Sequence, residues 1–201
     1  MVTTTFDLRA CRLPAWKRGM DLIFATLLLG LCSPLLALCW AAVRLTSPGP
    51  ALYWSRRVGK DNRLFLMPKF RTMRLDTPQV ATHLLRDPER YLTPVGARLR
   101  KTSLDELPQL VSVWKGDLTL VGPRPALFNQ DDLVALRTVR GVHRMVPGIT
   151  GWAQVNGRDE LDIPRKVAYD AEYMAGLSLG LDLKILALTL WKVIRGEGVR
   201  H

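Results

Sequence analysis

The chain has 201 residues, of which 48% are hydrophobic and 23% are charged. This length fits one domain of ordinary size with an accessory segment and excludes a large multidomain enzyme, and the composition is too apolar for a disordered chain. Lysine and arginine total 29 against 18 acidic residues, which gives a formal net charge of +11. An excess of basic residues of this size predicts an anionic partner, such as a phosphorylated substrate, acidic lipid headgroups or nucleic acid.

An uncharged apolar run covers residues 22–43. As a straight helix this run would be about 33 Å long, which is enough to span a bilayer. Ser33 and Pro34 lie near its middle, where the proline removes a backbone donor and bends or breaks a helix. Basic residues flank both ends, beginning with Lys17 and Arg44, and positive charge favours the cytoplasmic side. These residues alone leave three alternatives, which are a re-entrant hairpin, a kinked transmembrane helix and a buried helix of a soluble core.

The stretch Ser47-Pro48-Gly49-Pro50 is dense in helix breakers and marks the exit from the apolar segment. The rest of the chain predicts a mainly helical domain of the α+β class. Residues 51–58 and 64–70 are predicted to be two short strands joined by a turn, which together form a β-hairpin. Pro68 places the second strand toward an edge, because proline cannot donate a hydrogen bond to a neighbouring strand.

Helical signals resume at Thr93 and again at Ser103, which is followed by apolar residues at three- and four-residue spacings. Between the later helices, residues 147–158 are rich in turn formers. A helix is predicted over about 164–176 and another over about 181–194. The last one is strongly apolar but carries one acidic and two basic residues, which suits an amphipathic helix that lies on a membrane or closes the core.

The stretch Ser103-Leu104-Asp105-Glu106 fits a capping box, with Ser103 as the N-cap and Glu106 three residues later. The helix dipole favours acidic residues in this first turn, so a purely structural role is the alternative. Adjacent helical residues point about 100° apart, so Asp105 and Glu106 cannot play the same part. One carboxylate could attack a substrate while the other binds a metal or moves a proton.

Gly122-Pro123-Arg124-Pro125 places an arginine between two prolines, which restricts the backbone to an extended conformation. A preordered Arg124 is suited to a bidentate grip on phosphate, and the alternative is a rigid surface turn with a solvated side chain. Lys69, Arg71 and Arg158 are further candidates for phosphate contacts. The chain contains no Walker loop and no GxGxxG motif, so a nucleotide would be held in another way.

Five segments of the chain resemble, in the same order, those of the bacterial sugar transferase family, the monotopic polyprenyl-phosphate phosphoglycosyl transferases. Members of this family begin O-antigen, capsule and glycoprotein glycan assembly. The five segments cover most of the chain from Lys17 onward, and their common register makes the resemblance specific. They are Lys17-Arg18-Gly19-Met20-Asp21 leading into Ser33-Pro34, Lys69-Phe70-Arg71-Thr72-Met73, Ser103 to Leu110, Gly116 to Pro125, and Pro147 to Arg158.

The resemblance implies a membrane helix that breaks at Ser33 and Pro34 and re-enters one leaflet. Residues 1–46 would then form the membrane segment, and residues 47–201 a small cytosolic catalytic domain with amphipathic interfacial helices. The protein would be monotopic in the bacterial inner membrane, with its catalytic domain facing the cytoplasm. Its implied partners are a UDP-sugar, undecaprenyl phosphate and an anionic lipid bilayer, without nucleic acid, and a homodimer is an alternative to a monomer.

The resemblance also implies a two-step mechanism. Asp105 matches the family nucleophile and would attack the β-phosphate of the UDP-sugar, with Mg²⁺ neutralising charge, and release UMP. Undecaprenyl phosphate would then accept the sugar phosphate, while Glu106 assists the metal or deprotonates the acceptor. Asp105 and Glu106 are therefore both expected as metal ligands. The expected substrate contacts are Arg124, Lys69, Arg71, Gln154, Asn156, Arg158 and Asp170, with structural pairing as the alternative for the last four.

Two rival hypotheses accompany this prediction. The first is a non-enzymatic basic membrane anchor that binds acidic lipid or nucleic acid. The second keeps the transfer reaction but runs it in one ternary step, in which Asp105 only holds the metal. The sugar itself is not predicted, because no residue in 147–158 reports on a hydroxyl or an N-acetyl group.

Overall fold

The computed structural model describes residues 13–78, 87–157 and 160–195, which form a mainly helical structure with two small sheets. The α-helices are α1 (Ala15–Leu31), α2 (Ser33–Thr46), α3 (Gly96–Lys101), α4 (Leu110–Lys115), α5 (Asp131–Val139), α6 (Trp152–Val155), α7 (Ile163–Ala175) and α8 (Leu179–Arg195). The strands are β1 (Leu52–Val58), β2 (Leu64–Phe70), β3 (Thr119–Val121) and β4 (Gly148–Thr150). Short 3₁₀ segments are η2 (Lys60–Asn62), η4 (Pro88–Tyr91), η5 (Leu104–Gln109) and η6 (Val142–Arg144). The predicted α+β, mainly helical class is confirmed.

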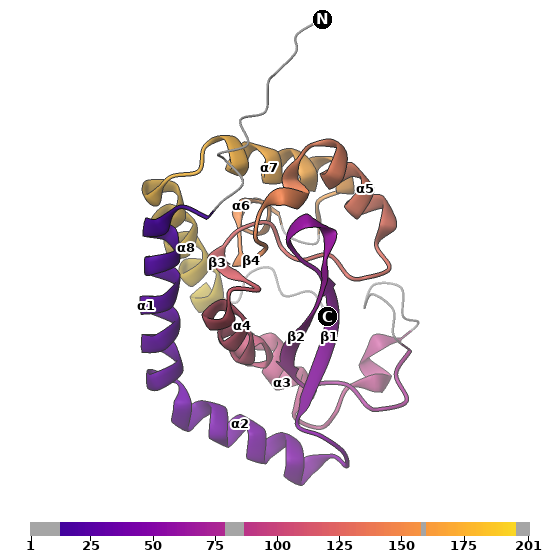
Figure 1. Cartoon of the computed structure of the whole chain (residues 1–201). Coiled ribbons are helices and arrows are strands. Elements are labelled where there is room, and N and C mark those ends of the chain that lie inside the picture. The colour runs from indigo at the N-terminus through magenta and orange to yellow at the C-terminus, as the bar shows by residue number, and fades with distance from the viewer. Residues whose placement is uncertain (1–12, 79–86, 158–159, 196–201) are drawn as a thin grey trace, which may run out of the picture.

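Helices α1 and α2 form a bent N-terminal arm that runs along one side and the base of the molecule (Figure 1). Pro34 lies in the first turn of α2, where its missing N–H is tolerated, and the Ser33 hydroxyl donates to the carbonyl of Gly30 at 2.8 Å. Among the described helices, none alone has the length and apolar composition to cross a membrane, whereas α1 and α2 together meet both criteria with a 61° bend. The predicted break at Ser33 and Pro34 is confirmed.

The two helices of this arm have different inner and outer faces. Ala25 of α1 and Val43 of α2 are completely buried, and Ala25 belongs to the main hydrophobic core. On the outer side, Leu31 is 80% exposed and Leu45 is 86% exposed, together with several other large apolar side chains. The arm therefore has a buried inner side and an outer side with many exposed large apolar side chains, whereas the core helix of a soluble protein is mostly buried.

The start of α1 is fixed to the rest of the molecule by buried polar contacts. The Lys17 ammonium forms an ion pair with Asp182 of α8 and also donates to the hydroxyl of Tyr173 at 3.1 Å. Arg18 donates to the carbonyl of Val113 at 2.6 Å. The use of Lys17 as a free basic flank in the membrane argument was therefore wrong, because its charge is neutralised inside the protein. Asp182 likewise does not belong to an exposed polar face of α8.

Strands β1 and β2 form the predicted antiparallel hairpin. In its register Tyr53 lies opposite Lys69 and Arg57 lies opposite Phe65. Because side chains alternate between the two faces of a strand, Arg57 and Lys69 are on the same face. Pro68 is accommodated without a bulge, since each strand of a two-stranded sheet is an edge and the proline needs no partner on its outer side.

The parallel pair of β3 and β4 was not predicted. Residues 148–150 lie within the stretch that we interpreted as turn formers, but they pair with Thr119–Val121. The two chains approach closely, because a Cβ atom added at Gly148 would lie 2.1 Å from the backbone nitrogen of Gly122. Strands of three residues carry no hydrophobic periodicity, so only this long-range pairing defines them.

The main core lies between the arm, the hairpin and the C-terminal helices. Its buried members include Met67 from β2, Val113 from α4, Val121 from β3 and Ile185 from α8. Helices α7 and α8 agree with the predicted ranges to within two residues, and Asp162 caps α7. This packing places η5 against β2, directly beside the loop that follows β3.

Candidate active site

The carboxylate pair lies on η5, whose geometry differs from the predicted capping box. Ser103 adopts a left-handed conformation with φ 55°, and its side chain makes no capping hydrogen bond. The segment is a 3₁₀ helix, and Pro108 inside it cannot donate a backbone hydrogen bond to the preceding turn. The capping box was wrong, and the Glu106 side chain is consequently free to turn toward other partners.

Glu106 is held by two cations from different elements. Its Oε1 atom lies 2.9 Å from the Nζ atom of Lys69 and also accepts from the Nη2 atom of Arg124. Its Oε2 atom accepts from Arg124 Nη1 at 3.3 Å. Burial alone would raise the pKa of Glu106, but the charges and hydrogen bonds of Arg124 and Lys69 outweigh burial and hold it well below its usual range. Glu106 is therefore ionised, and both of its oxygens are occupied.

Asp105 has a different environment, although it is the neighbouring residue. It is only 8% exposed, and no described residue donates a hydrogen bond to its carboxylate. Burial raises the pKa of Asp105; the positive charge of Lys69 opposes this rise, and the negative charge of Glu106 adds to it. The two carboxylates are therefore unequal, as their adjacent helical positions predicted, and Asp105 is the one that has no hydrogen-bonded partner among the described residues.

Two arginines complete the site and were missed by the sequence analysis. Arg57 donates to the carbonyl of Pro125 at 3.2 Å, and burial, followed by the charge of Arg124, lowers its pKa to about 10. Arg100 donates to the hydroxyl of Thr72 at 2.9 Å; burial lowers its pKa, while the two carboxylates oppose this effect. The hairpin register could have indicated Arg57, since it shares a face with Lys69, but Arg100 had no signal.

The charges in this cluster do not balance. Among the described residues, Lys69, Arg57, Arg100 and Arg124 supply four positive charges, and Asp105 and Glu106 supply two negative charges, which leaves a net charge of +2. Burial lowers the pKa of Lys69 and Arg57, which shows that these cations lie in an environment that disfavours their charge. A doubly anionic group such as a diphosphate would compensate the excess and approach Asp105 at the same time.

The structure separates Arg71 and Asp170 from this cluster. Arg71 is buried and donates to the carbonyls of Pro50 and Ser47, at 2.7 and 3.2 Å. Asp170 forms an ion pair with Arg137 at 2.6 Å, and Arg137 in turn donates to the backbone carbonyl of Arg124 at 2.7 Å. Asp170 thus shows the structural pairing that we gave as its alternative, in a position that supports the Arg124 backbone.

The remaining predicted contacts lie near the loop of β4. Gln154 donates weakly to the carbonyl of Ile149 at 3.5 Å, and its Oε1 atom is buried without a partner among the described residues. Ile149 also accepts from Arg124, so Gln154 is close to the cluster. Asn156 donates to the carbonyl of Trp152 at 2.8 Å and is exposed. Arg158 lies outside the described residues.

The expected Mg²⁺ ligands fit unequally. No group of three or more acidic, histidine or cysteine side chains gathers within the described residues. Mg²⁺ in proteins is often bound by one or two carboxylates together with substrate phosphate oxygens. Asp105 fits this pattern because its oxygens accept no hydrogen bond from described residues, whereas both Glu106 oxygens already accept from Lys69 or Arg124, whose positive charges oppose a cation there.

The order and spacing of these residues agree with a known family. The sequence profile described as "Bacterial sugar transferase" matches residues 13–196, which is almost the whole chain. The chain belongs to the bacterial sugar transferase family. It is therefore a transferase enzyme, and the carboxylate cluster on η5 is the candidate active site of this sugar transferase.

Named relatives agree with this assignment. The "Uncharacterized sugar transferase EpsL" of Bacillus subtilis (strain 168) is 44% identical over 185 residues, 92% of this sugar transferase and 90% of the relative. "Exopolysaccharide production protein ExoY" of Rhizobium meliloti (strain 1021) is 36% identical and covered to 87% of its length by 90% of this chain. "UDP-glucose:undecaprenyl-phosphate glucose-1-phosphate transferase" of Escherichia coli (strain K12) is 40% identical over 88% of this chain, which spans only 39% of that relative.

Proposed function

We propose that this sugar transferase moves a sugar phosphate from a UDP-sugar to undecaprenyl phosphate, releases UMP, and passes through a covalent intermediate on Asp105. The observation that carries the proposal is the difference between two adjacent carboxylates. Glu106 is held by Lys69 and Arg124, whereas Asp105 accepts no hydrogen bond from the described residues and lies within an excess of positive charge. The printed name of the Escherichia coli relative supports the donor and the acceptor.

In the first proposed step, a carboxylate oxygen of Asp105 forms a bond to the β-phosphorus of the UDP-sugar, which carries the sugar. The bond from this phosphorus to the bridging oxygen breaks, and UMP leaves with the electron pair. Lys69 and Arg124 lie where they could stabilise the phosphate oxygens, and Arg57 adds a third nearby charge. Asp105 must be ionised to attack, so activity is lost as the pH falls through its raised pKa.

In the second step, an oxygen of undecaprenyl phosphate attacks the same phosphorus. The bond to Asp105 breaks, which restores the carboxylate and yields the lipid diphosphosugar. Because Glu106 is ionised and bound through both oxygens, we assign it the role of orienting Lys69 and Arg124 toward the phosphates. When bound, Mg²⁺ would neutralise part of the diphosphate charge, with Asp105 as its protein ligand.

The proposed location is the cytoplasmic face of the bacterial inner membrane, where α1 and α2 would enter one leaflet as a hairpin. The 61° bend and the uncovered apolar side chains of this arm support the hairpin. Single cysteines placed at each terminus and labelled in oriented vesicles test it, and we expect both on the same face. Termini on opposite faces would instead establish a kinked transmembrane helix. Initiation of O-antigen, capsule or glycoprotein glycan assembly is the proposed setting.

The experiment that tests the function is UMP release from a panel of UDP-sugars in the presence of undecaprenyl phosphate. We expect UMP release with at least one UDP-sugar. The Asp105→Asn variant should lose this release although it folds like the wild-type protein. A basic membrane anchor without catalytic activity would consume no UDP-sugar, and Asp105→Ala would leave its lipid binding intact. Failure of the wild-type protein to release UMP from every donor would therefore favour the anchor.

A further inference from the structure

A hollow lies where the chain leaves α2, away from the carboxylate cluster. Its volume is about 460 Å³, a size typical of sites for small ligands. The end of α2 and its exit turn form one side, the segment after β2 forms the second, and residues 92–94 form the third. The lining includes Arg71, Arg74 and Leu75 but none of the residues that contact Glu106.

Arg71, which lines this hollow, carries a positive charge that no described carboxylate neutralises through an ion pair. Arg71 is 5% exposed, and burial together with the nearby Arg44 guanidinium lowers its pKa. Arg71 and Arg44 donate to backbone carbonyls, including those of Pro50 and Gly49, but no described carboxylate forms an ion pair with either. Carbonyl oxygens accept from the Arg71 guanidinium but carry no formal charge, so among the described residues the charge of this buried cation is uncompensated, which is unfavourable unless an anion is close.

The third arginine, Arg74, is accessible to a ligand in the hollow. Arg74 is exposed and pairs with Asp76 on the same short segment, at 3.1 and 2.8 Å. Both side chains of this bidentate pair are 60% exposed, so solvent and salt screen it and another anion can compete with Asp76 for Arg74. Arg71, Arg74 and Asp76 line the hollow, and Arg44 lies close enough to Arg71 to lower its pKa, so these four described residues carry a net charge of +2.

The position of the hollow indicates what kind of anion it would meet. If α1 and α2 form the proposed membrane hairpin, α2 returns to the membrane surface at its C-terminal end, beside the hollow. Leu45 and Leu75 are 86% and 66% exposed at this end, so apolar surface adjoins the arginines. At a membrane surface, basic side chains can bind the phosphate of a lipid while neighbouring apolar side chains contact its acyl chains.

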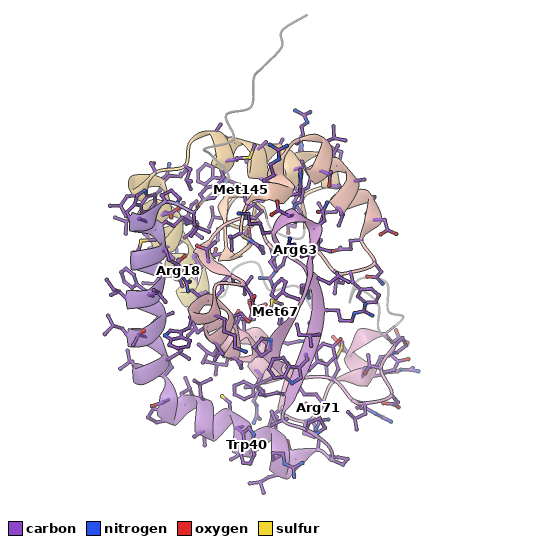
Figure 2. All side chains as sticks on the ribbon, viewed as in Figure 1. Arg18, Trp40, Arg63, Met67, Arg71 and Met145 are labelled. Atoms are coloured by element: carbon purple, nitrogen blue, oxygen red, sulfur yellow. The ribbon has the colours of Figure 1, made fainter. Side chains whose placement is uncertain are left out.

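The hollow is separated from the candidate active site by the chain itself. Arg71 turns to the carbonyls of the α2 exit turn, whereas the next residue, Thr72, accepts a hydrogen bond from Arg100 on the other side. Figure 2 shows Arg71 at the lower end of the hairpin, near the end of the arm, with Arg63 at the opposite end. A ligand in this hollow would therefore leave the carboxylates open to substrate.

We propose that the hollow beside the end of α2 binds the phosphate headgroup of an anionic membrane phospholipid through Arg71 and Arg74, with the nearby Arg44 adding positive charge. Such a lipid would fix the height of the catalytic domain above the bilayer. The proposal rests on the membrane hairpin that forms part of the proposed function. It does not depend on the transfer chemistry, because its residues are not those of the carboxylate cluster.

Thermal unfolding of the detergent-solubilised protein tests the proposal, with soluble short-chain phosphatidylglycerol as the probe and the phosphatidylcholine of the same chain length as the comparison. A ligand that binds only the folded state raises Tm, by about 4 °C when present at about ten times its Kd. We expect this rise with phosphatidylglycerol and not with phosphatidylcholine. Equal shifts with both lipids would overturn the proposal.

Two double variants separate a local site from general attraction to basic protein. Arg44→Gln/Arg74→Gln removes two charges at the hollow, and Arg63→Gln/Arg140→Gln removes two exposed charges elsewhere. We expect only the first to abolish the rise in Tm. Retention of the rise in the first variant, or equal loss in both, would overturn the proposal. An equal rise with inorganic phosphate, lost in the same variant, would identify a free-phosphate site instead.

The same samples distinguish this proposal from the transfer reaction. UMP release measured in detergent without phospholipid should be equal within about twofold in the wild-type protein and in Arg44→Gln/Arg74→Gln. A raised KM for undecaprenyl phosphate in this variant would mean that the hollow holds the acceptor, which would overturn the phospholipid assignment. Absence of UMP release from the wild-type protein would refute the proposed function while leaving the Tm results as they stand.

Discussion

Two clusters of charged side chains lie inside this sugar transferase, and they are built differently. Lys17 and Asp182 are 2% and 0% exposed, form one ion pair, and share the hydroxyl of Tyr173. In the other cluster Lys69, Glu106 and Arg124 have side chains that are 15%, 17% and 28% exposed, and its cations outnumber its carboxylates. The closed, balanced cluster joins elements of the fold, while the open, unbalanced one suits an anionic ligand.

The balanced cluster also holds the strand that leads to Arg124. The Tyr173 hydroxyl donates to Asp182 at 2.6 Å and lies 3.1 Å from the carbonyl of Val121. Asp21 of α1 accepts from the hydroxyl of Thr119 and the backbone of Leu120, at 2.7 and 2.9 Å. The N-terminal part of α1 is thus joined to β3, so that the N-terminal arm and the candidate active site are parts of one packed unit.

The largest effect should follow from removal of the proposed nucleophile. Asp105→Asn keeps the size of the side chain but cannot form the covalent intermediate, and we expect UMP release to fall by about 10⁴-fold or more. Single-turnover assays with the UDP-sugar measure this loss. Because Asp105 makes no hydrogen bond to described residues, Tm should change little, and a large fall in Tm would assign the lost activity to unfolding.

The balanced cluster should respond in stability rather than in chemistry. Lys17→Met leaves Asp182 buried without a counter-charge, which should lower the free energy of unfolding by about 3 to 5 kcal/mol. The double variant Lys17→Met/Asp182→Leu removes both charges and should recover most of this loss. Chemical unfolding in detergent measures both variants. If the double variant were as unstable as the single one, the ion pair would contribute more than mutual neutralisation.

A smaller effect is expected from Arg57, which the sequence analysis missed. Arg57→Gln removes one excess positive charge near Arg124, and we expect kcat/KM for the UDP-sugar to fall by about 10²-fold. Arg56→Gln is the matched control, because Arg56 is the neighbouring residue on the other face of β1 and is exposed. Equal losses in the two variants would indicate a general charge effect and argue against a contact at the site.

The smallest effects are opposite shifts in pH dependence. Lys69 lowers the pKa of Asp105 and Glu106 raises it. Since activity requires ionised Asp105, the acid limb of the residual activity should move to higher pH in Lys69→Met and to lower pH in Glu106→Gln. Profiles of kcat/KM from about pH 4 to pH 8 measure both. Shifts in the same direction would show that the acid limb does not report on Asp105.

Features with local signals were predicted correctly from the sequence. Pro34 broke the apolar helix, two runs of strand-forming residues gave the β1–β2 hairpin, and the helix predicted over about 164–176 is α7. Lys69, Arg124 and Glu106 were named as candidates, and the structure brings them together. The motifs were informative because Lys69 lies in a predicted strand and Arg124 lies between two prolines, so both could be recognised from their local sequence.

The features that failed depend on contacts between distant parts of the chain. Lys17 and Asp182 are 165 positions apart, so a basic residue beside an apolar run could not reveal its buried partner. The capping box failed because Lys69 and Arg124 bind Glu106 more strongly than a backbone N–H would. Short strands such as β4 have no periodic pattern, and only their pairing identifies them.

The central claim is that Asp105 becomes covalently attached to the sugar phosphate before the acceptor lipid binds. Incubation of the protein with a UDP-sugar, without undecaprenyl phosphate, tests this claim directly by UMP release and by mass spectrometry of the peptide that contains Asp105. We predict one equivalent of UMP per protein and a sugar-phosphate addition on this peptide, absent in Asp105→Asn. If UMP appeared only after undecaprenyl phosphate was added, the transfer would occur in one ternary step and the account would be contradicted.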